Sequence, residues 1–370
     1  MYKVCHITSV HDQGDVRIFE KECTSLAKRD DFDVYLVAAG ESRTQNGVKI
    51  IGAGTRPQGR IRRATGFASR IVDTAVGLGA DVYHFHDPEF VLYAKRLKAT
   101  GAKIIFDSHE DNYTQILYKP YIPVAVRKPA ATAYRRHENK ALKYIDAVIF
   151  PCMISGRHPF EGRAKRYIFI DNLPIIGDVS ERELTDEMRR TVCCVGSLTE
   201  ARGTTQLVEA CRRAGVKLIL AGNISPPEYK ERLTTDDIFS YVDYRGYCDR
   251  SQVERIYSVS GIGASTIQRV GQYPIIYNLP TKVYEFMSMA IPFVVSDFDF
   301  ARRVTEEYDC GIAVDPADID AIAAAIKTLA DNPSRAGEMG RNGRKAAEER
   351  FNWAIEEKKL YDLYDELLGI

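Results

Sequence analysis

Short apolar runs alternate along the chain with longer segments in which apolar residues recur at helical spacing. Several runs in the first half are apolar at consecutive positions, as expected for strands of a parallel sheet that helices cover on both faces. Helix-length segments lie between them, for example at residues 16–29 and 88–100. The repeated alternation indicates a doubly wound α/β fold. The pattern predicts strands at residues 3–8, 33–38, 82–86, 103–107 and 147–150.

A second series of the same kind begins after residues 168–179, IFIDNLPIIGDV, which we interpret as a linker that follows a strand. We therefore expect two doubly wound domains in succession, residues 1–172 and 173–352. The last stretch, residues 353–370, predicts a helix rich in Glu, Lys and Leu. In the second domain, strands are predicted at residues 192–196, 217–221, 242–244, 262–264 and 293–296, and helices at 204–214, 251–258, 281–289 and 319–330.

Composition agrees with two globular domains, because 370 residues exceed what one hydrophobic core usually supports. The net charge is zero but unevenly distributed. Residues 1–175 hold 27 Lys and Arg against 19 Asp and Glu, whereas the remainder holds 24 against 32. A basic first half suits an anionic partner such as a phosphate, an acidic lipid or a nucleic acid. No nucleic-acid-binding module is recognisable.

The cysteines and the first residues bear on the compartment. Eight cysteines are present, none in a Cys-x-x-Cys pair, and most lie in apolar or helical contexts. This is typical of reduced thiols in a cytosolic protein. The opening MYKVCHITSV does not resemble a secretory signal, and no run of about 18 apolar residues exists. We therefore expect a cytoplasmic protein without a membrane span.

Polar motifs follow the predicted strands, where open α/β sheets bind ligands. The first turn, SVHDQGD, has one glycine, Gly14, and lacks the Gly-x-Gly-x-x-Gly pattern of dehydrogenases. In HFHDPEF, His84 and His86 share one face of a strand, which would suit a metal. We favour a helix cap by Asp87, with one histidine lining a cleft. The motif DSHEDNY after residue 106 is either a substrate site or another cap cluster.

Two motifs of the second half suit an anionic, hydroxylated ligand. In VGSLTEARG, a glycine-flanked loop places Arg202 near a helix start, where anions bind. In NLPTKVYEFMSMAIPFVVSD, Lys282 and Glu285 lie one helical turn apart. Lys282 can pair with a phosphate, and Glu285 can accept both hydroxyls of a ribose. The pair could equally be an ordinary surface salt bridge, so the residues alone leave both readings open.

Taken together and in order, these motifs resemble the group-one, family-four retaining glycosyltransferases of the GT-B fold, of the bacterial surface-polysaccharide type. The resemblance covers nearly the whole chain, from HDQGDVRIFEKECTSLAK through HFHDPEF, FDSHEDNYTQIL, DNLP and VGSLTEARG to LPTKVYEFMSMAIPFVVSD. It implies two Rossmann-like domains that face each other across a cleft. It also implies that the C-terminal helix crosses back to the N-terminal domain.

The resemblance assigns roles to individual residues. It makes Glu285 the ligand of the donor ribose, Arg202 the ligand of the donor diphosphate, His109 a neighbour of the transferred sugar, and Gly14 the turn that diphosphate approaches. The predicted catalytic residues are His109, Arg202 and Lys282. The predicted donor-binding residues are Gly14, Gly196, Ser197, Arg202, Lys282 and Glu285. The predicted acceptor-binding residues are Asp15, Arg17, His84, His86, Asp87 and Glu110.

The sequence departs from the family pattern at two positions. Ser197 replaces an arginine that neutralises phosphate in many members, a role that Lys282 can take. Tyr277 lies eight residues before Glu285, where the family has the first glutamate of a pair, so the identity of the sugar stays open. Asp297 and Asp299 form a D-x-D sequence, which we interpret as structural because GT-B enzymes need no metal.

The predicted function is transfer of a sugar, with retention, from a nucleoside diphosphate sugar, expected to be a UDP-sugar, to a hydroxyl of a saccharide or lipid-linked saccharide. No cofactor and no metal are expected. The basic stretch at residues 56–70, with five arginines, and an apolar pair, Phe67 and Ile71, predict peripheral attachment to an anionic membrane; a solvated loop is the alternative. Two rival functions remain: a sugar-nucleotide epimerase of the same fold and a non-catalytic sugar or nucleotide binder.

Overall fold

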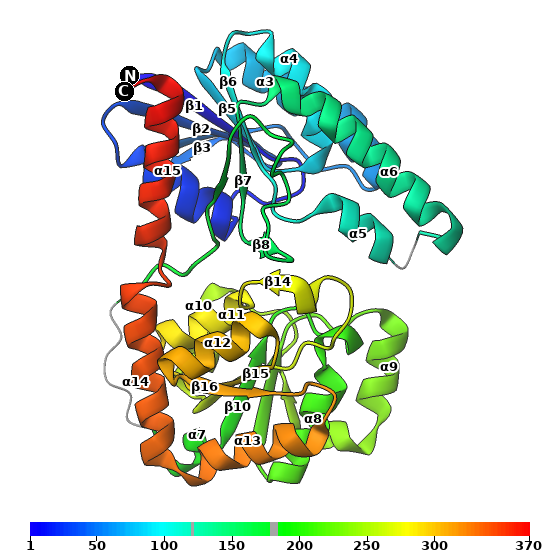
Figure 1. The fold of residues 1–370 in the computed structure, drawn as a ribbon, viewed down its shortest axis with the longest axis vertical. Helices are drawn as coiled ribbons and strands as arrows, with labels where there is room; N and C mark the ends of the chain where they lie inside the picture. Colours follow the sequence, from blue (N-terminus) through cyan, green and yellow to red (C-terminus); the bar gives the residue numbers. More distant parts are fainter. Residues whose placement is uncertain (120–121, 178–183) are drawn as a thin grey trace. The chain divides into compact units, whose positions relative to one another are not determined.

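The computed structural model describes residues 1–119, 122–177 and 184–370, and it divides into two compact units. Unit 1 comprises Met1–Asn172 and Trp353–Ile370, and unit 2 comprises Leu173–Asn352. Each unit has a largely parallel sheet between layers of helices (Figure 1). The predicted α/β class is confirmed. Residues 178 and 179 of the predicted linker lie outside the described residues.

The described residues of unit 1 form an eight-stranded sheet in the order β3-β4-β2-β1-β5-β6-β7-β9. The neighbouring strands run parallel except β3 and β4. The chain leaves β1 toward β2 and later returns on the other side with β5, so the strand order reverses between β1 and β5. The strands of this sheet are β1 (Tyr2–Ile7), β2 (Phe32–Ala38), β3 (Arg43–Gln45), β4 (Val48–Gly52), β5 (Val82–Phe85), β6 (Lys103–Asp107), β7 (Ala147–Phe150) and β9 (Tyr167–Phe169). The short strand β8 (Met153–Ile154) lies outside it.

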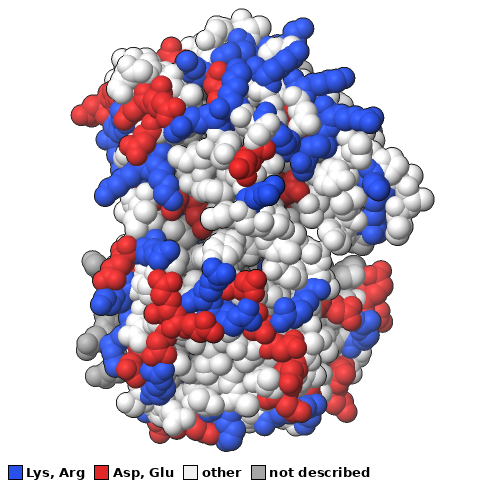
Figure 2. Space-filling view, viewed as in Figure 1, with Lys and Arg blue, Asp and Glu red and all other residues white. Residues whose placement is uncertain are grey.

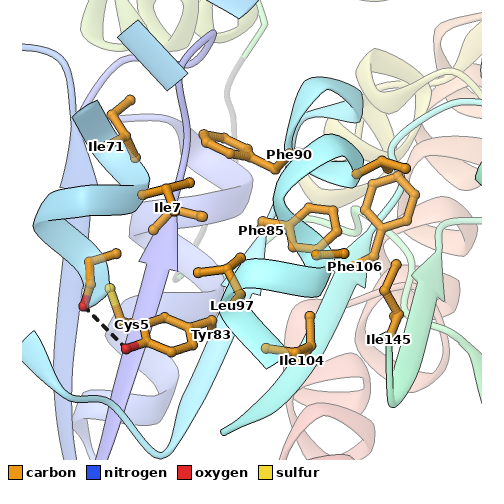
Figure 3. Close-up of a cluster of buried hydrophobic side chains, with 14 of the residues drawn as sticks. Cys5, Ile7, Ile71, Tyr83, Phe85, Phe90, Leu97, Ile104, Phe106 and Ile145 are labelled. Atoms are coloured by element: carbon orange, nitrogen blue, oxygen red, sulfur yellow. Dashed lines mark hydrogen bonds between the residues drawn. The ribbon is translucent and has the colours of Figure 1, made fainter. Parts of the chain in front are cut away.

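Alternation along these strands separates two kinds of environment. Cys5, Tyr83, Phe85, Ile104 and Phe106 point to one face, where they pack with α3 and α4 in a dry apolar cluster (Figure 3). The opposite face packs on η1 and α15 and is also largely apolar. Several strand positions of that second face nevertheless carry histidine or aspartate, and these form the polar layer described below.

The helical segments of unit 1 are shorter and less regular than the sequence predicts. Residues 16–29 form a π-helix followed by one short α-helical turn, and residues 88–100 form a 3₁₀ segment followed by a short α-helix. The segments are η1 (Val16–Cys23), α1 (Thr24–Ala27), α2 (Arg60–Arg62), η2 (Arg63–Phe67), α3 (Ala68–Leu78), η3 (Pro88–Tyr93), α4 (Ala94–Lys98), α5 (Asn112–Tyr118), α6 (Val124–Ala141), η4 (Leu142–Tyr144) and α15 (Trp353–Leu368).

The described part of unit 2 contains a six-stranded parallel sheet in the order β12-β11-β10-β13-β15-β16, whose order reverses between β10 and β13. The strands of this sheet are β10 (Thr191–Val195), β11 (Lys217–Ala221), β12 (Val242–Tyr244), β13 (Ile262–Ser265), β15 (Phe293–Ser296) and β16 (Gly311–Val314). The short strand β14 (Ile276–Tyr277) lies outside it. The helices are α7 (Asp186–Arg189), η5 (Glu200–Arg202), α8 (Thr204–Ala214), α9 (Pro227–Thr235), η6 (Asp237–Tyr241), α10 (Arg250–Ser258), η7 (Tyr273–Ile275), α11 (Thr281–Ser288), α12 (Asp299–Tyr308), α13 (Ile319–Asp331) and α14 (Pro333–Glu349).

The tail helix α15 packs on unit 1, as predicted (Figure 1, red). Its buried residues Leu360, Leu363 and Tyr364 join the apolar cluster of β1, β2 and η1. Trp353 donates from its indole nitrogen to the Ser25 hydroxyl at 2.8 Å. The helix therefore forms part of the hydrophobic core of unit 1.

Two further expectations concern cysteines and membrane spans. All eight cysteines are free thiols, six of them buried, which agrees with the reduced state predicted from their spacing. Within the described ranges, no helix is both long enough and apolar enough to cross a membrane.

Truncation of Leu363 should loosen the tail helix. Leu363→Ala leaves a cavity in the core and is expected to lower the free energy of unfolding of unit 1 by about 2–5 kcal/mol. Trp353 is the only tryptophan of the chain and begins α15, so its fluorescence during urea unfolding reports this helix. Lys358→Ala, at an exposed position of α15, serves as the control. Equal unfolding midpoints for both variants would contradict the packing described.

Candidate functional site

The loop after β1 is held by a buried carboxylate from the loop after β5. Asp87, which is 1% exposed, accepts hydrogen bonds from the Thr8 hydroxyl at 2.9 Å and from the backbone N–H groups of Ser9 at 2.6 Å and Val10 at 3.2 Å. Asp87 occupies the N-cap position of η3 and Pro88 follows it, as predicted, but the Asp87 side chain makes no cap hydrogen bond there. Asp87 instead fixes the β1 loop at the point where the strand order reverses.

The same loop ends in a charged pair at the start of η1. The Asp15 carboxylate caps η1 by accepting from the N–H groups of Arg17 and Ile18, and it lies 2.8 Å from His11 Nδ1. Burial favours neutral His11, but the hydrogen bond to Asp15 and the charge of Asp87 outweigh it and raise the His11 pKa. Asp15 keeps a lowered pKa, because its bonds to His11 and to the backbone outweigh its partial burial.

Gly14 lies between these groups on an exposed turn. A Cβ built on Gly14 meets no described atom within 4 Å, so the space above this residue is open. The backbone of the turn is therefore accessible to a ligand, as a diphosphate would require.

At the end of β6, Asp107 combines a buried ion pair with a partly exposed histidine. Arg17 donates to both Asp107 oxygens, at 2.7 and 2.9 Å, and to the Ile170 carbonyl at 3.0 Å. Burial would raise the Asp107 pKa, but the Arg17 charge and His109 hold it well below its usual range. His109 Nε2 lies 3.1 Å from Asp107, and its side chain is 22% exposed. Glu110 follows on the surface.

Burial revises part of the predicted acceptor set. Arg17, His84, His86 and Asp87 are at most 5% exposed and are held within unit 1, so they leave no surface for contact with an acceptor. We assign them to positioning the neighbouring loops. Asp15, which is 24% exposed, and Glu110 retain accessible side chains.

Unit 2 has an open pocket at the carboxyl ends of β10 and β11. Its volume is about 320 Å³, and it is lined by Val195, Gly196, Ser197, Ala221, Gly222, Asn223, Ser225, Tyr247 and Cys248. Gly196 and Gly222 have φ angles of +110° and +135°, which disfavour side chains. A Cβ on Gly222 would lie 1.8 Å from the Gly196 carbonyl oxygen, so the two loops approach each other backbone to backbone.

Helix α11 places Lys282 beside this pocket. Lys282 Nζ lies 3.5 Å from the Cys194 sulfur and 3.8 Å from the position of a Cβ on Gly196. The structure thus brings Gly196, Ser197 and Lys282 together. No side chain of the described residues caps the N-terminus of α11, so its first N–H groups are available to an anion.

One turn further along α11, Glu285 is oriented by two partners that sequence reasoning missed. Arg250 Nη1 donates to Glu285 Oε1 at 2.8 Å, and the Tyr257 hydroxyl donates to Oε2 at 2.6 Å. Burial and the charge of Glu285 raise the Tyr257 pKa well above its usual range, so this hydroxyl stays a donor. Among the described ion pairs Glu285 binds Arg250, not Lys282 as the alternative interpretation required. Arg250 is the first residue of α10 and directly follows the capping residue Asp249. In the sequence, this position at a helix start was the only sign that Arg250 could belong to a site.

Arg202 lies in η5, and its guanidinium stacks over Tyr273 at 5.7 Å. It is not among the residues that line the pocket. Gly203, with φ +71°, allows this loop to pack against Thr266, because a Cβ would lie 1.9 Å from the Thr266 carbonyl. Asp297 pairs with Arg269, and Asp299 pairs with Arg302, an arrangement that agrees with a structural role for the D-x-D sequence.

Comparison with known proteins supports the fold and part of the sequence resemblance. Residues 177–346 match the profile of the family "Glycosyl transferases group 1". Sucrose-phosphate synthase from Thermosynechococcus elongatus is similar in structure, with 16% identity, 100% of both chains covered and a TM-score of 0.72. No curated protein matches the sequence.

Two other solved structures are similar over the same length. HepE of Anabaena, in complex with UDP and glucose, has 15% identity, coverage of 99% of this chain and 100% of its own, and a TM-score of 0.71. A glycosyltransferase from Rickettsia africae has 14% identity, coverage of 99% and 98%, and a TM-score of 0.67. These likenesses confirm the predicted GT-B fold class.

The raised His11 pKa predicts a pH-dependent stability. A group whose pKa is higher in the folded state stabilises the fold fully below its unfolded pKa of about 6.5 and loses this effect as pH rises through the folded pKa. His11→Gln should therefore lower the melting temperature more at about pH 6 than at about pH 9. His137→Gln, at an exposed position of α6, controls for loss of an imidazole. A deficit of equal size at both pH values would refute the charged pair with Asp15.

Proposed function

We propose that this protein, a member of the group 1 glycosyl transferases by its residues 177–346, transfers a sugar with retention from a UDP-sugar to a hydroxyl group of a saccharide acceptor. The observation that carries the proposal is the pocket of unit 2, which the loops after β10 and β11 line and beside which α11 places Lys282. The complex of the similar HepE with UDP and glucose supports the choice of donor.

The diphosphate of the donor fits the Gly196 side of this pocket. Two glycine loops let phosphate oxygens approach the backbone closely, and Lys282 supplies a cation beside them. The uncapped first turn of α11 adds N–H donors and the positive end of a helix dipole. Lys282 thus replaces the charge that Ser197 lacks. Arg202 would need to leave Tyr273 to add its own charge.

The ribose fits Glu285. An ionised carboxylate has about four lone pairs, of which Arg250 and Tyr257 occupy one on each oxygen. The remaining lone pairs can accept the two hydroxyl protons of a ribose diol. Because Arg250 and Tyr257 already fix the orientation of the carboxylate, little side-chain entropy is lost when the nucleotide binds.

In the proposed reaction, the bond between the anomeric carbon and the β-phosphate oxygen breaks, and the acceptor oxygen bonds to the same face of that carbon. The acceptor proton passes to the departing phosphate oxygen. Negative charge builds on the diphosphate, where Lys282, Arg202 and the α11 N-terminus stabilise it. His109, oriented by Asp107, is proposed to contact the transferred sugar.

The acceptor is proposed to carry phosphate or another anionic group, as a lipid-linked saccharide in polysaccharide or glycolipid biosynthesis does. Lys and Arg side chains are dense on the face of unit 1 shown in Figure 2. Phe67 and Ile71 are buried in the core, so the prediction that they share a membrane-facing surface is wrong. Ile61 is the exposed large apolar side chain of the basic stretch at residues 56–70. Peripheral attachment to the cytoplasmic face of a membrane would therefore depend chiefly on charge, and liposome binding should require anionic lipid and fall with salt.

Donor binding and turnover together test the function. UDP should raise the melting temperature more than GDP or ADP, because we expect UDP to bind more tightly. A ligand that binds only the folded state stabilises the protein in proportion to its affinity. Turnover of UDP-glucose should then require an acceptor from a bacterial lipid or saccharide extract and should persist in EDTA, since cationic side chains replace a metal at the phosphates. Interconversion of UDP-glucose without acceptor would instead identify an epimerase, and binding without turnover a non-catalytic protein.

Glu285→Gln tests the ribose contact with the smallest change of shape. Loss of the charged acceptor should weaken UDP binding by about 1.5–3 kcal/mol, about 10- to 150-fold in Kd by calorimetry. Glu254→Gln is the matched control, because Glu254 pairs with the same arginine, Arg250, from an exposed position. Equal affinities for UDP in both variants would remove Glu285 from the site.

A further inference from the structure

Unit 1 encloses three histidines and a glutamate that face one another in its interior. His6 comes from β1, His84 from β5, His86 from the residue after β5, and Glu22 from η1. None is more than 2% exposed. One ligand atom from each of the four lies within 4.8 Å of those of the other three. The three imidazole rings approach with centroid separations of 4.4, 4.6 and 5.3 Å.

The distances between these atoms fit one small ion. Two ligands at about 2.05 Å on a tetrahedral zinc ion lie about 3.3–3.4 Å apart. His6 Nδ1 and His86 Nε2 are 3.0 Å apart. Glu22 Oε2 lies 3.7 Å from His84 Nε2 and 3.9 Å from His86 Nε2. Shifts of a few tenths of an ångström would bring all these pairs to the tetrahedral spacing.

Each imidazole also has a partner on its other nitrogen, as histidine ligands of metals do. His84 Nδ1 lies 3.0 Å from the Tyr364 hydroxyl, which in turn lies 3.3 Å from His6 Nε2. His86 Nδ1 lies 3.3 Å from the Asp107 carboxylate. These contacts leave His6 Nδ1, His84 Nε2 and His86 Nε2 as the nitrogens available to an ion, and His6 Nδ1 and His86 Nε2 lie at hydrogen-bond distance from each other.

Two of the four side chains, Glu22 and His84, are poorly satisfied by the protein. Among the described residues, no hydrogen-bond partner is found for either carboxylate oxygen of Glu22 or for His84 Nε2, although all three atoms are buried. Arg17 Nε is 3.2 Å from Glu22 Oε1, but this guanidinium already gives two hydrogen bonds to Asp107. One positive charge thus faces two buried carboxylates, and Glu22 needs either a proton or a cation.

We propose that His6, Glu22, His84 and His86 bind one zinc ion through His6 Nδ1, His84 Nε2, His86 Nε2 and a Glu22 oxygen. Three imidazoles and one carboxylate are ligands that suit zinc, and a site closed on all sides by protein is structural. The ion links β1 and β5 to η1. It is separate from the donor phosphates, which unit 2 binds in the proposed function. For the interior of unit 1, this proposal differs from the sequence-based expectation of no metal.

A neighbouring group offers a weaker alternative. His86, Asp107 and His109 also lie close enough to share an ion. Both Asp107 oxygens, however, accept from Arg17, so a cation there would compete with a buried guanidinium. In the four-residue group Arg17 approaches Glu22 Oε1 at 3.2 Å, and among the described residues Glu22 Oε2 has no hydrogen-bond partner.

Metal content of the full-length protein tests the proposal directly. Elemental analysis after dialysis against EDTA should find about one zinc per chain, which is released when the protein is unfolded. Refolding with Co²⁺ in place of zinc should give the visible absorption of a tetrahedral cobalt site. Protein that holds no zinc, and that also takes up neither ion on refolding, would overturn the proposal.

Glu22→Gln separates a bound cation from a bound proton. Gln has the shape of protonated Glu, so a proton-filled site would keep its thermal stability in this variant, whereas a zinc site would lose most of its metal and its stability. Tyr364→Phe keeps all four ligands and should weaken zinc binding about 10- to 100-fold. His137→Gln, at an exposed histidine, should retain full zinc content. Equal zinc content in Glu22→Gln and wild type would place the metal elsewhere and refute this site.

Discussion

Arg17 carries a positive charge into the interior of unit 1, and the position of the loops around it follows from how that charge is neutralised. Both carboxylate oxygens of Asp107 accept hydrogen bonds from Arg17, and the Ile170 carbonyl is a third acceptor. Removing one partner of such a buried pair costs about 3–5 kcal/mol. Because Asp107 also accepts from His109 and contacts His86, the same carboxylate fixes the end of β6, the end of β5 and the start of η1 together.

The two units use one architecture in different ways. Both reverse their strand order beside the first strand, where open sheets bind ligands. In unit 1 this place is filled from inside by carboxylates and imidazoles, and Asp87 anchors the loop above them. In unit 2 the open pocket lies at the ends of β10 and β11, to one side of the reversal, where Gly196 and Gly222 have no side chains to fill it. A rigid polar layer suits the placement of exposed groups such as His109, whereas open backbone suits the binding of a flexible diphosphate.

The sequence predicted the central strands of both sheets well because they are buried on both faces, whereas β3, β4, β9 and β16, toward the sheet edges, were not predicted. Residues 103–107, 147–150, 217–221 and 293–296 were predicted with the bounds that the structure has. Helical segments near the site of unit 1 were predicted less well, since tertiary contacts decide them. The Asp87 side chain was expected to cap η3, but its carboxylate accepts hydrogen bonds from the loop after β1 instead. No local sequence pattern reveals this long-range contact. Likewise Glu285 was found from its motif, while Arg250, 35 positions away, was not.

Position relative to the end of a strand decides whether a polar residue serves the interior or the surface. His84 and Asp107 belong to β5 and β6 themselves, and His86 directly follows β5, so the sheet still fixes the direction of their side chains toward η1 and α15. His109 lies two residues beyond β6, where the chain has left the sheet and the ring reaches solvent. Motif letters such as H-x-H or D-S-H do not carry this difference, because it depends on where the last strand hydrogen bond is made. Asp87 is an exception: it lies two residues beyond β5 but is buried, because its carboxylate binds the loop after β1. A motif that spans the end of a strand can therefore combine residues that support the fold with residues that are available to a ligand.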